Sequence, residues 1–289
     1  GVSAPGPQIW RSLIMKARLI TAAIGIVILL LVFILLPKIG IAVFVALLSL
    51  MAVYELTIST KLLKNSRMVI YSMAFAAFIP IWSYFDNNGT AGAIGVFVYI
   101  LLMFGENLIA HRDMDCRDTA AAVGLSFMVP FMLSSIVRLS LLKCGRSYAL
   151  LPLVIAFLSD TGAMLGGMLF GKHKLTPELS PKKTVEGAIS GVVLSVIATV
   201  VYGVIVKAAC GHGVNFVVLV ITALMGSALS QIGDLTFSLI KRHSGIKDYS
   251  SVLKGHGGIM DRFDSVCFAA PLVELMVTIA AVFTTTSLI

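Results

Sequence analysis

Long apolar stretches separated by short polar segments make up most of the chain. A membrane-spanning helix needs about 20 mostly apolar residues, and the punctuation by Pro37, the Asp86-to-Gly89 turn and Gly211 to Gly213 separates stretches of this length. The pattern predicts an all-α, polytopic integral membrane bundle of about nine transmembrane helices. The expected spans are 18–36, 39–60, 68–85, 90–110, 120–142, 148–170, 186–207, 214–240 and 264–287.

Composition agrees with a membrane protein. The 289 residues are 58% hydrophobic and 12% charged, whereas an average soluble domain is about 25% charged. The four cysteines are far apart in the sequence and form no CxxC motif, which indicates free thiols and neither a disulfide framework nor a zinc site. They are Cys116, Cys144, Cys210 and Cys267.

The net charge of +8 is concentrated in alternate loops. If the nine spans cross the membrane in alternating directions, most basic residues fall in loops on one side. The loops on the other side carry only Lys38, Lys143, Arg146 and Lys207. The positive-inside rule then predicts a cytoplasmic N-terminus and cytoplasmic polar loops, with the C-terminus outside. The residues of the basic side are Arg11, Lys16, Arg18, Lys61, Lys64, Arg67, His111, Arg112, Arg117, Lys172, Lys174, Lys182, Lys183, Lys241, Arg242, Lys247, Lys254 and Arg262.

Ionisable residues within the spans divide the chain into two parts. Residues 1–145 carry few and are expected to be a membrane scaffold, whereas residues 146–289 are expected to form a catalytic membrane domain with Asp160 and Asp234 inside spans. A central aspartate costs about 2.5–3.5 kcal/mol unless it is paired, binds a cation or faces water. A purely structural role for Asp160, satisfied by Ser159, Thr161 or a neighbouring helix, remains open.

The stretch FGKHKLTPELSPKKTVEG at 170–187 suggests an anion site. Ser180 followed by Pro181 has the pattern of a helix N-cap and first helical residue. Lys182 and Lys183 would then join free backbone N–H groups in the first turn, where a phosphate would offset their charge. The alternative is that these lysines only set the topology.

The third stretch, residues 227–265, ends in KGHGGIMDRFD. Asp234, Ser238, Lys241 and Arg242 would follow one another along a helix, and Lys247, Asp248 and His256 lie in a loop rich in glycine and serine. Such a loop is rarely a mere connector.

Asp261 and Asp264 are three residues apart, so on a helix they would share a face and a cation. The glycines at 255, 257 and 258 would allow the backbone to approach a ligand closely. Carboxylates for Mg²⁺ beside basic groups for phosphates indicate phosphoryl or nucleotidyl transfer.

These motifs resemble a known family. Residues 238–264, SLIKRHSGIKDYSSVLKGHGGIMDRFD, are similar to the signature of CTP:phosphatidate cytidylyltransferases, also called CDP-diacylglycerol synthases. The stretches beginning at Ser159, Phe170 and Ser180 also resemble that family. One departure is Lys254, which stands where the family usually has proline.

The resemblance implies that CTP and phosphatidate give CDP-diacylglycerol and pyrophosphate in a homodimer of the bacterial-type inner (plasma) membrane. It implies Mg²⁺ together with K⁺ as cofactors and no nucleic-acid partner. It implies Asp234, Asp261 and Asp264 as metal ligands. The implied catalytic set adds Asp160, Asp248, Lys241 and His256. The implied phosphate-binding set is Lys172, Ser180, Lys182, Lys183, Thr184, Arg242, Lys247, Gly257, Gly258 and Arg262.

Two other functions are compatible with parts of this pattern. A related CTP-dependent membrane enzyme could act on another lipid phosphate or on a polyprenol. A cation-coupled transporter could also use intramembrane aspartates. The absence of a visible repeat and the concentration of charge in the loops weigh against transport.

Overall fold

The computed structural model describes residues 25, 27–29, 31–85, 89–110, 115–250 and 257–285, and helices dominate this part of the chain. Two short antiparallel pairs of strands accompany them: β1 (Lys174–Thr176) with β2 (Ser180–Thr184), and β3 (His212–Val214) with β4 (Phe283–Thr285). The helices are α2 (Lys38–Ser59), α3 (Ser66–Phe85), α4 (Thr90–Ile109), α5 (Cys116–Leu133), α6 (Ser135–Leu141), α7 (Gly145–Phe170), α8 (Val185–Cys210), α9 (Phe216–His243) and α10 (Met260–Ile279).

Within the described residues, seven segments are long and apolar enough to cross a membrane, which confirms the predicted all-α polytopic class. They correspond to predicted spans two to eight, with the fifth formed by α5 and α6 on either side of Ser134. The predicted span 264–287 corresponds to α10, which begins four residues earlier, ends at Ile279 and is not among the seven. Most of the predicted span 18–36 lies outside the described residues.

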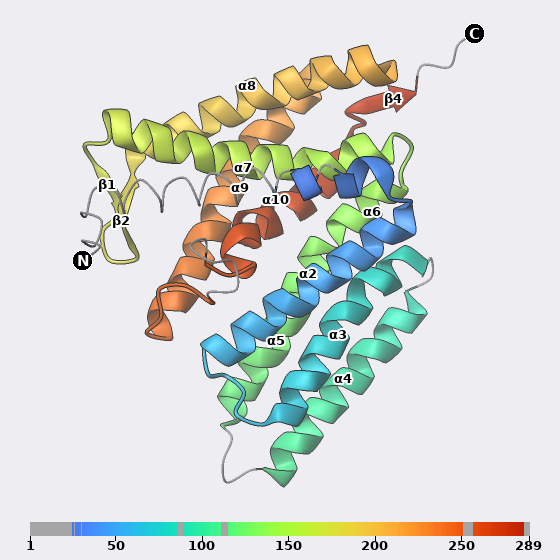
Figure 1. The fold of residues 1–289 in the computed structure, drawn as a ribbon, viewed down its shortest axis with the longest axis vertical. Coiled ribbons are helices and arrows are strands. Elements are labelled where there is room, and N and C mark those ends of the chain that lie inside the picture. The colour runs from blue at the N-terminus through green and yellow to red at the C-terminus, as the bar shows by residue number, and fades with distance from the viewer. Residues whose placement is uncertain are drawn as a thin grey trace, which may run out of the picture.

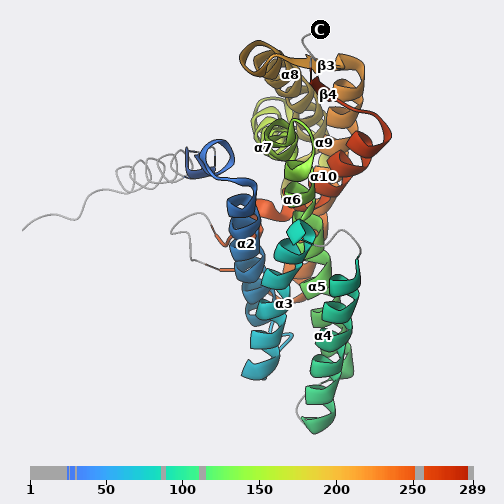
Figure 2. The same ribbon diagram turned by 90° about the vertical axis from the view of Figure 1, so that its right-hand side faces the viewer.

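The helices form two groups that run in different directions. Helices α2, α3, α4 and α5 run alongside one another, whereas α7 and α8 lie side by side across the direction of that group (Figure 1). The view at right angles shows α2 to α5 extending away from the end of the molecule that holds α7, α8 and β4 (Figure 2). Helix α9 packs against α7, α8 and α10, and α10 joins the two groups because it also contacts α2 and α5.

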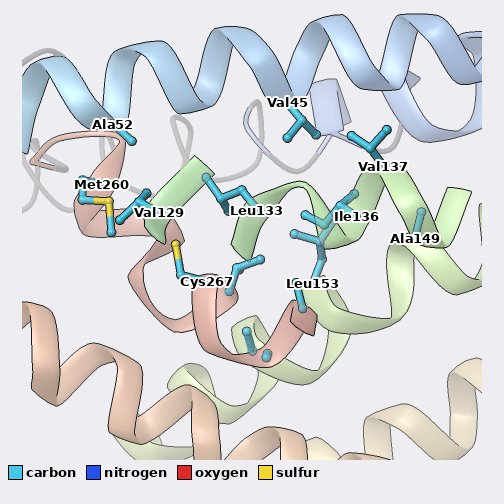
Figure 3. Packing of buried hydrophobic residues seen from close by; sticks show 14 of the residues in the cluster. Val45, Ala52, Val129, Leu133, Ile136, Val137, Ala149, Leu153, Met260 and Cys267 are labelled. Carbon is cyan, nitrogen blue, oxygen red and sulfur yellow. The ribbon is translucent and has the colours of Figure 1, made fainter. Parts of the chain in front are cut away.

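A shared hydrophobic core connects the two predicted parts of the chain. Figure 3 shows Val45 of α2 and Leu133 of α5 facing the same interior as Leu153 of α7 and Cys267 of α10. All four are almost completely buried. The division at residue 145 stays a prediction, but the scaffold packs directly against the part that carries the candidate site.

An ion pair neutralises the charge that the sequence places in the fifth span. Arg138 of α6 donates through Nε to Glu274 Oε1 at 2.6 Å and through Nη2 to Oε2 at 2.8 Å. Glu274 belongs to α10, so the two-point contact joins these helices. Pairing of this kind is what allows a charged residue to occupy an apolar span.

Glycines allow α7 and α8 to approach each other closely, because small residues at a helix interface let the two backbones come near. A Cβ atom on Gly162 would lie 2.9 Å from the Ser190 carbonyl oxygen of α8. A Cβ atom on Gly166 would lie 2.1 Å from Ser190 Oγ. The contact therefore depends on the missing side chains at these two positions.

We expect Gly166→Ala to lower the free energy of unfolding by about 1–3 kcal/mol, because the added methyl group must push α8 away. Thermal unfolding of the purified protein in detergent measures this change. Gly124→Ala is the matched control, since a Cβ atom at Gly124 has no neighbour within 4 Å. Equal effects of the two substitutions would contradict the packing role.

Candidate active site

Three of the predicted acids come together from three different helices. Asp160 of α7, Asp234 of α9 and Asp264 of α10 interact electrostatically with one another. Ser265 connects two of them: its Oγ donates to Asp160 Oδ2 at 2.9 Å, and its backbone N–H donates to Asp264 Oδ1 at 2.8 Å. Asp160 is therefore satisfied from a neighbouring helix, since Ser159 contacts Ser227 and Thr161 donates to the carbonyl of Phe157.

Asp261 lies in a separate network beside these three. Its Oδ1 is 2.7 Å from Lys241 Nζ, and its Oδ2 accepts from the backbone N–H groups of Tyr249 and Gly258, each at 2.9 Å. The side chains of Asp261 and Lys241 are only 8% and 11% exposed. Lys241 also interacts electrostatically with Asp264, so it connects Asp261 to the cluster of three acids.

Lys183 reaches the acids from the β1–β2 hairpin. Its Nζ lies 2.5 Å from Asp234 Oδ2, and both side chains are about one quarter exposed, at 26% and 28%. The preceding Lys182 is exposed. The hairpin is also attached to the end of α9, where Arg242 Nε donates to the Leu179 carbonyl oxygen at 3.2 Å.

The predicted helix start at Ser180 is wrong. Ser180 to Thr184 form β2, where Ser180 pairs with Thr176, and Lys182 and Lys183 therefore lie in a strand. Helix α8 begins at Val185, and Thr184 is its N-cap, with Oγ1 accepting from the Gly187 N–H at 3.1 Å. Cross-strand pairing takes precedence over the local Ser-Pro signal, and Thr184 caps α8 in place of Ser180.

The other predicted residues are more dispersed. Lys172, Lys182, Arg242, Lys247, Asp248 and Arg262 are exposed, and Gly257 and Gly258 lie at the start of α10. His256 lies outside the described residues, as does Lys254. The structure thus brings together the four acids Asp160, Asp234, Asp261 and Asp264 with Lys183 and Lys241.

The sequence did not single out several contacts around this centre. Tyr249 is buried; its hydroxyl donates to the Phe237 carbonyl oxygen at 3.1 Å, and its ring lies under Lys241 Nζ at 5.3 Å. Burial, then the nearby Asp261 carboxylate, raises the pKa of this hydroxyl, which therefore stays neutral. Glu186 accepts from His173 Nδ1 at 2.6 Å at the base of the hairpin. In the sequence, Ser265 stands out only by its position directly after Asp264, and nothing local indicates that it contacts Asp160.

The donor chemistry of this centre suits a hard cation, because every acidic group offers oxygen ligands. Within the described residues, no group of three or more His, Cys, Asp or Glu side chains has metal-binding spacing. Lysines instead contact Asp234 and Asp261. Ser265 is the hydrogen-bond donor to Asp160 Oδ2 and to Asp264 Oδ1.

The fold and this centre define a polytopic helical membrane protein with a partly buried network of acids and lysines where α7, α9 and α10 meet the β1–β2 hairpin. The model of the cytidylyltransferase family matches residues 16–280. The chain belongs to this family, which confirms the resemblance seen in its sequence.

Relatives of the chain carry the name phosphatidate cytidylyltransferase. The protein of Staphylococcus haemolyticus (strain JCSC1435) is 34% identical over 182 residues, covering 62% of this chain and 65% of the relative. The protein of Staphylococcus aureus (strain COL) is 32% identical over 190 residues, covering 64% and 66%. The chain thus spans just under two thirds of the length of these relatives.

We expect Lys241→Met to lower the free energy of unfolding by about 3–5 kcal/mol, because it leaves the buried Asp261 carboxylate without its cation. Thermal unfolding in detergent measures the loss, and adding Asp261→Asn should recover part of it. Arg67→Met is the control, since Arg67 is 71% exposed in its pair with Glu106 and should cost about 1 kcal/mol or less. Strictly additive losses for Lys241→Met and Asp261→Asn would contradict the coupling.

Proposed function

We propose that this protein is a nucleotidyltransferase that forms CDP-diacylglycerol and pyrophosphate from CTP and phosphatidate. The observation that supports this most strongly is the convergence of carboxylates from α7, α9 and α10 with Lys183 and Lys241 in a chain of the cytidylyltransferase family. The name of the relatives supports phosphatidate as the acceptor. We further propose a homodimer in a bacterial-type inner membrane, with the candidate site facing the cytoplasm.

The reaction needs little acid–base chemistry. A phosphate monoester has a second pKa near 6 and is already largely ionised at neutral pH. In the proposed step, an oxygen of the phosphatidate phosphate forms a bond to the α-phosphorus of CTP. The bond from that phosphorus to the bridging oxygen of the β-phosphate breaks, and pyrophosphate leaves with the electron pair.

The main obstacle is repulsion between two anionic reactants, so catalysis would rest on charge neutralisation and positioning. Lys183 is suited to this role because it is partly exposed and is carried by a hairpin. Lys241 is more enclosed and would act close to Asp261 and Asp264. The exposed Lys172, Lys182, Arg242, Lys247 and Arg262 would attract the polyphosphate of CTP toward the site.

Mg²⁺ fits this centre by donor type, and we propose Asp234, Asp261 and Asp264 as its ligands, with Asp160 and Asp248 in support and K⁺ as a possible second ion. When bound, a divalent ion would neutralise phosphate oxygens of both reactants. Lys183 and the donors to Asp261 hold these carboxylates in place. His256 would donate to a phosphate oxygen or order the glycine pair.

The assay that tests the proposal uses the purified chain in detergent with radiolabelled CTP, phosphatidate and Mg²⁺, followed by lipid extraction. Label in the organic phase is expected. Parallel reactions with an ether-lipid phosphate or a polyprenol show whether another acceptor is preferred. Two results together would favour transport instead. The label would remain in the aqueous phase with every acceptor, and sealed vesicles would take up solute when an ion gradient is applied.

Asp234→Asn should lower kcat/KM by about 10²-fold or more, the loss typical of removing one group that stabilises transition-state charge. The same radiolabel assay measures it. Asp118→Asn is the control, since Asp118 lies in the first turn of α5, away from this centre. Near wild-type turnover of the Asp234→Asn variant would contradict the proposed role.

Removal of divalent metal should abolish turnover while leaving the fold intact. EDTA treatment is expected to reduce label transfer to background, and added Mg²⁺ should restore it. Thermal unfolding, measured on the same samples, distinguishes loss of the ion from loss of the fold. Full activity in excess chelator would contradict the metal proposal.

A further inference from the structure

Carboxylates hold three consecutive backbone N–H groups at the start of α10. Gly258 N–H donates to Asp261 Oδ2 at 2.9 Å. Ile259 N–H donates to Glu55 Oε1 at 3.0 Å, and Met260 N–H donates to Glu55 Oε2 at 2.9 Å. Glu55 lies in α2, about 200 residues earlier in the chain, and is 1% exposed.

Helix α10 depends on this distant residue because it has no side-chain cap of its own. Its N-cap position is Ile259, which makes no side-chain capping hydrogen bond. The first N–H groups of a helix have no partner within the helix, and a carboxylate there also interacts favourably with the helix dipole. Glu55 of α2 thus supplies the hydrogen-bond acceptors for the first N–H groups of α10.

The glycine pair fits between the two carboxylates. A Cβ atom on Gly258 would lie 2.3 Å from Glu55 Oε2. Gly257 has a φ of +78°, and a Cβ atom on it would lie 2.9 Å from Asp261 Oδ2. In this structure the glycines at 257 and 258 therefore allow close approach to the protein's own acids.

Helix α2 also contacts Tyr249 and Ser250, which lie in the loop that follows α9. Ser250 Oγ donates to Glu55 Oε1 at 2.6 Å. One turn beyond Glu55, Ser59 Oγ donates to the Tyr249 carbonyl oxygen, and the N–H of Tyr249 donates to Asp261 Oδ2. The last turns of α2 thus contact both ends of the network around Asp261.

We propose that Glu55 is a positioning residue that fixes Asp261 and Asp264 at the start of α10 from the N-terminal half of the chain. Its catalytic consequence rests on the proposed function. Among the described residues, Glu55 accepts hydrogen bonds from the backbone N–H groups of Ile259 and Met260 and from the hydroxyl of Ser250. It acts by setting where the first turn of α10 begins.

Glu55→Gln tests the proposal with little change in volume. Both oxygens of Glu55 accept hydrogen bonds, so the new amide group must face at least one N–H or hydroxyl donor. Glu106→Gln is the matched control. Glu106 is also a buried glutamate in the N-terminal half, but its partners are Asn65, Arg67 and Tyr71.

The first measurement is hydrogen–deuterium exchange of the peptide that contains residues 258–260, in detergent and without substrates. Exchange should be faster in Glu55→Gln than in wild type and unchanged in Glu106→Gln, because only the former loses an acceptor for the N–H groups of Ile259 and Met260. Unchanged exchange in Glu55→Gln would overturn the proposal. This measurement does not depend on which reaction the protein catalyses.

The second measurement is steady-state kinetics with CTP and phosphatidate. Glu55→Gln should lower kcat about tenfold or more with little change in KM for CTP, as expected when catalytic groups are displaced from their productive positions. Glu106→Gln should keep kcat. Faster exchange with unchanged kcat would overturn the positioning role, whereas an inactive wild type with faster exchange in Glu55→Gln would count only against the proposed function.

Glu55→Asp keeps the proposal testable if the glutamine variant does not fold. Aspartate keeps two acceptor oxygens but is one methylene shorter, so exchange and kcat should fall between wild type and Glu55→Gln. A shift in thermal midpoint with wild-type kcat and exchange would mean that Glu55 only stabilises the fold, which overturns the proposal.

Discussion

Buried negative charge is the constraint around which this structure is organised. An aspartate removed from water is costly unless a cation or several donors compensate it. Four aspartates lie where α7, α9 and α10 converge, and different donors compensate each of them. Asp160 accepts from the Ser265 hydroxyl, and Asp264 accepts from the Ser265 backbone N–H. Asp234 pairs with Lys183, whereas Asp261 pairs with Lys241 and accepts from two backbone N–H groups. These contacts attach the β1–β2 hairpin and the start of α10 to the centre.

The same constraint explains why the N-terminal half matters to a site whose acids all lie in the C-terminal half. The core that Val45 and Leu133 share with Leu153 and Cys267 fixes α2 against α10. Glu55 then uses that fixed placement to satisfy the first turn of α10. The scaffold and the chemical centre are thus parts of one packed unit, although the ionisable residues within the spans suggest a division at about residue 145.

Sequence reasoning was most successful where the physics is local or compositional. Apolar length predicted the spans from 39–60 to 214–240. The meeting of Asp160, Asp234 and Asp264 was anticipated only through the rule that intramembrane acids need partners and through the family resemblance.

Long-range contacts could not be read from local patterns. Ser180 looked like a helix cap because the preference for Ser-Pro is local, while its pairing with Thr176 depends on the hairpin. Glu55 was visible as an acid near the end of an apolar span, but nothing in its neighbourhood pointed to residues 259 and 260. Likewise, spacing placed Asp261 and Asp264 together, whereas the donors around Asp261 come from a different segment, at Lys241 and Tyr249.

The close approach of Gly258 to Glu55 has a consequence for how such sequences diverge. A larger residue at position 258 is compatible with this geometry only if position 55 shortens or moves, since 2.3 Å leaves no room for an added carbon. Two positions separated by about 200 residues are therefore expected to covary among homologues. Paired substitutions at positions 55 and 258 would then be detectable even between family members whose overall sequence identity is low.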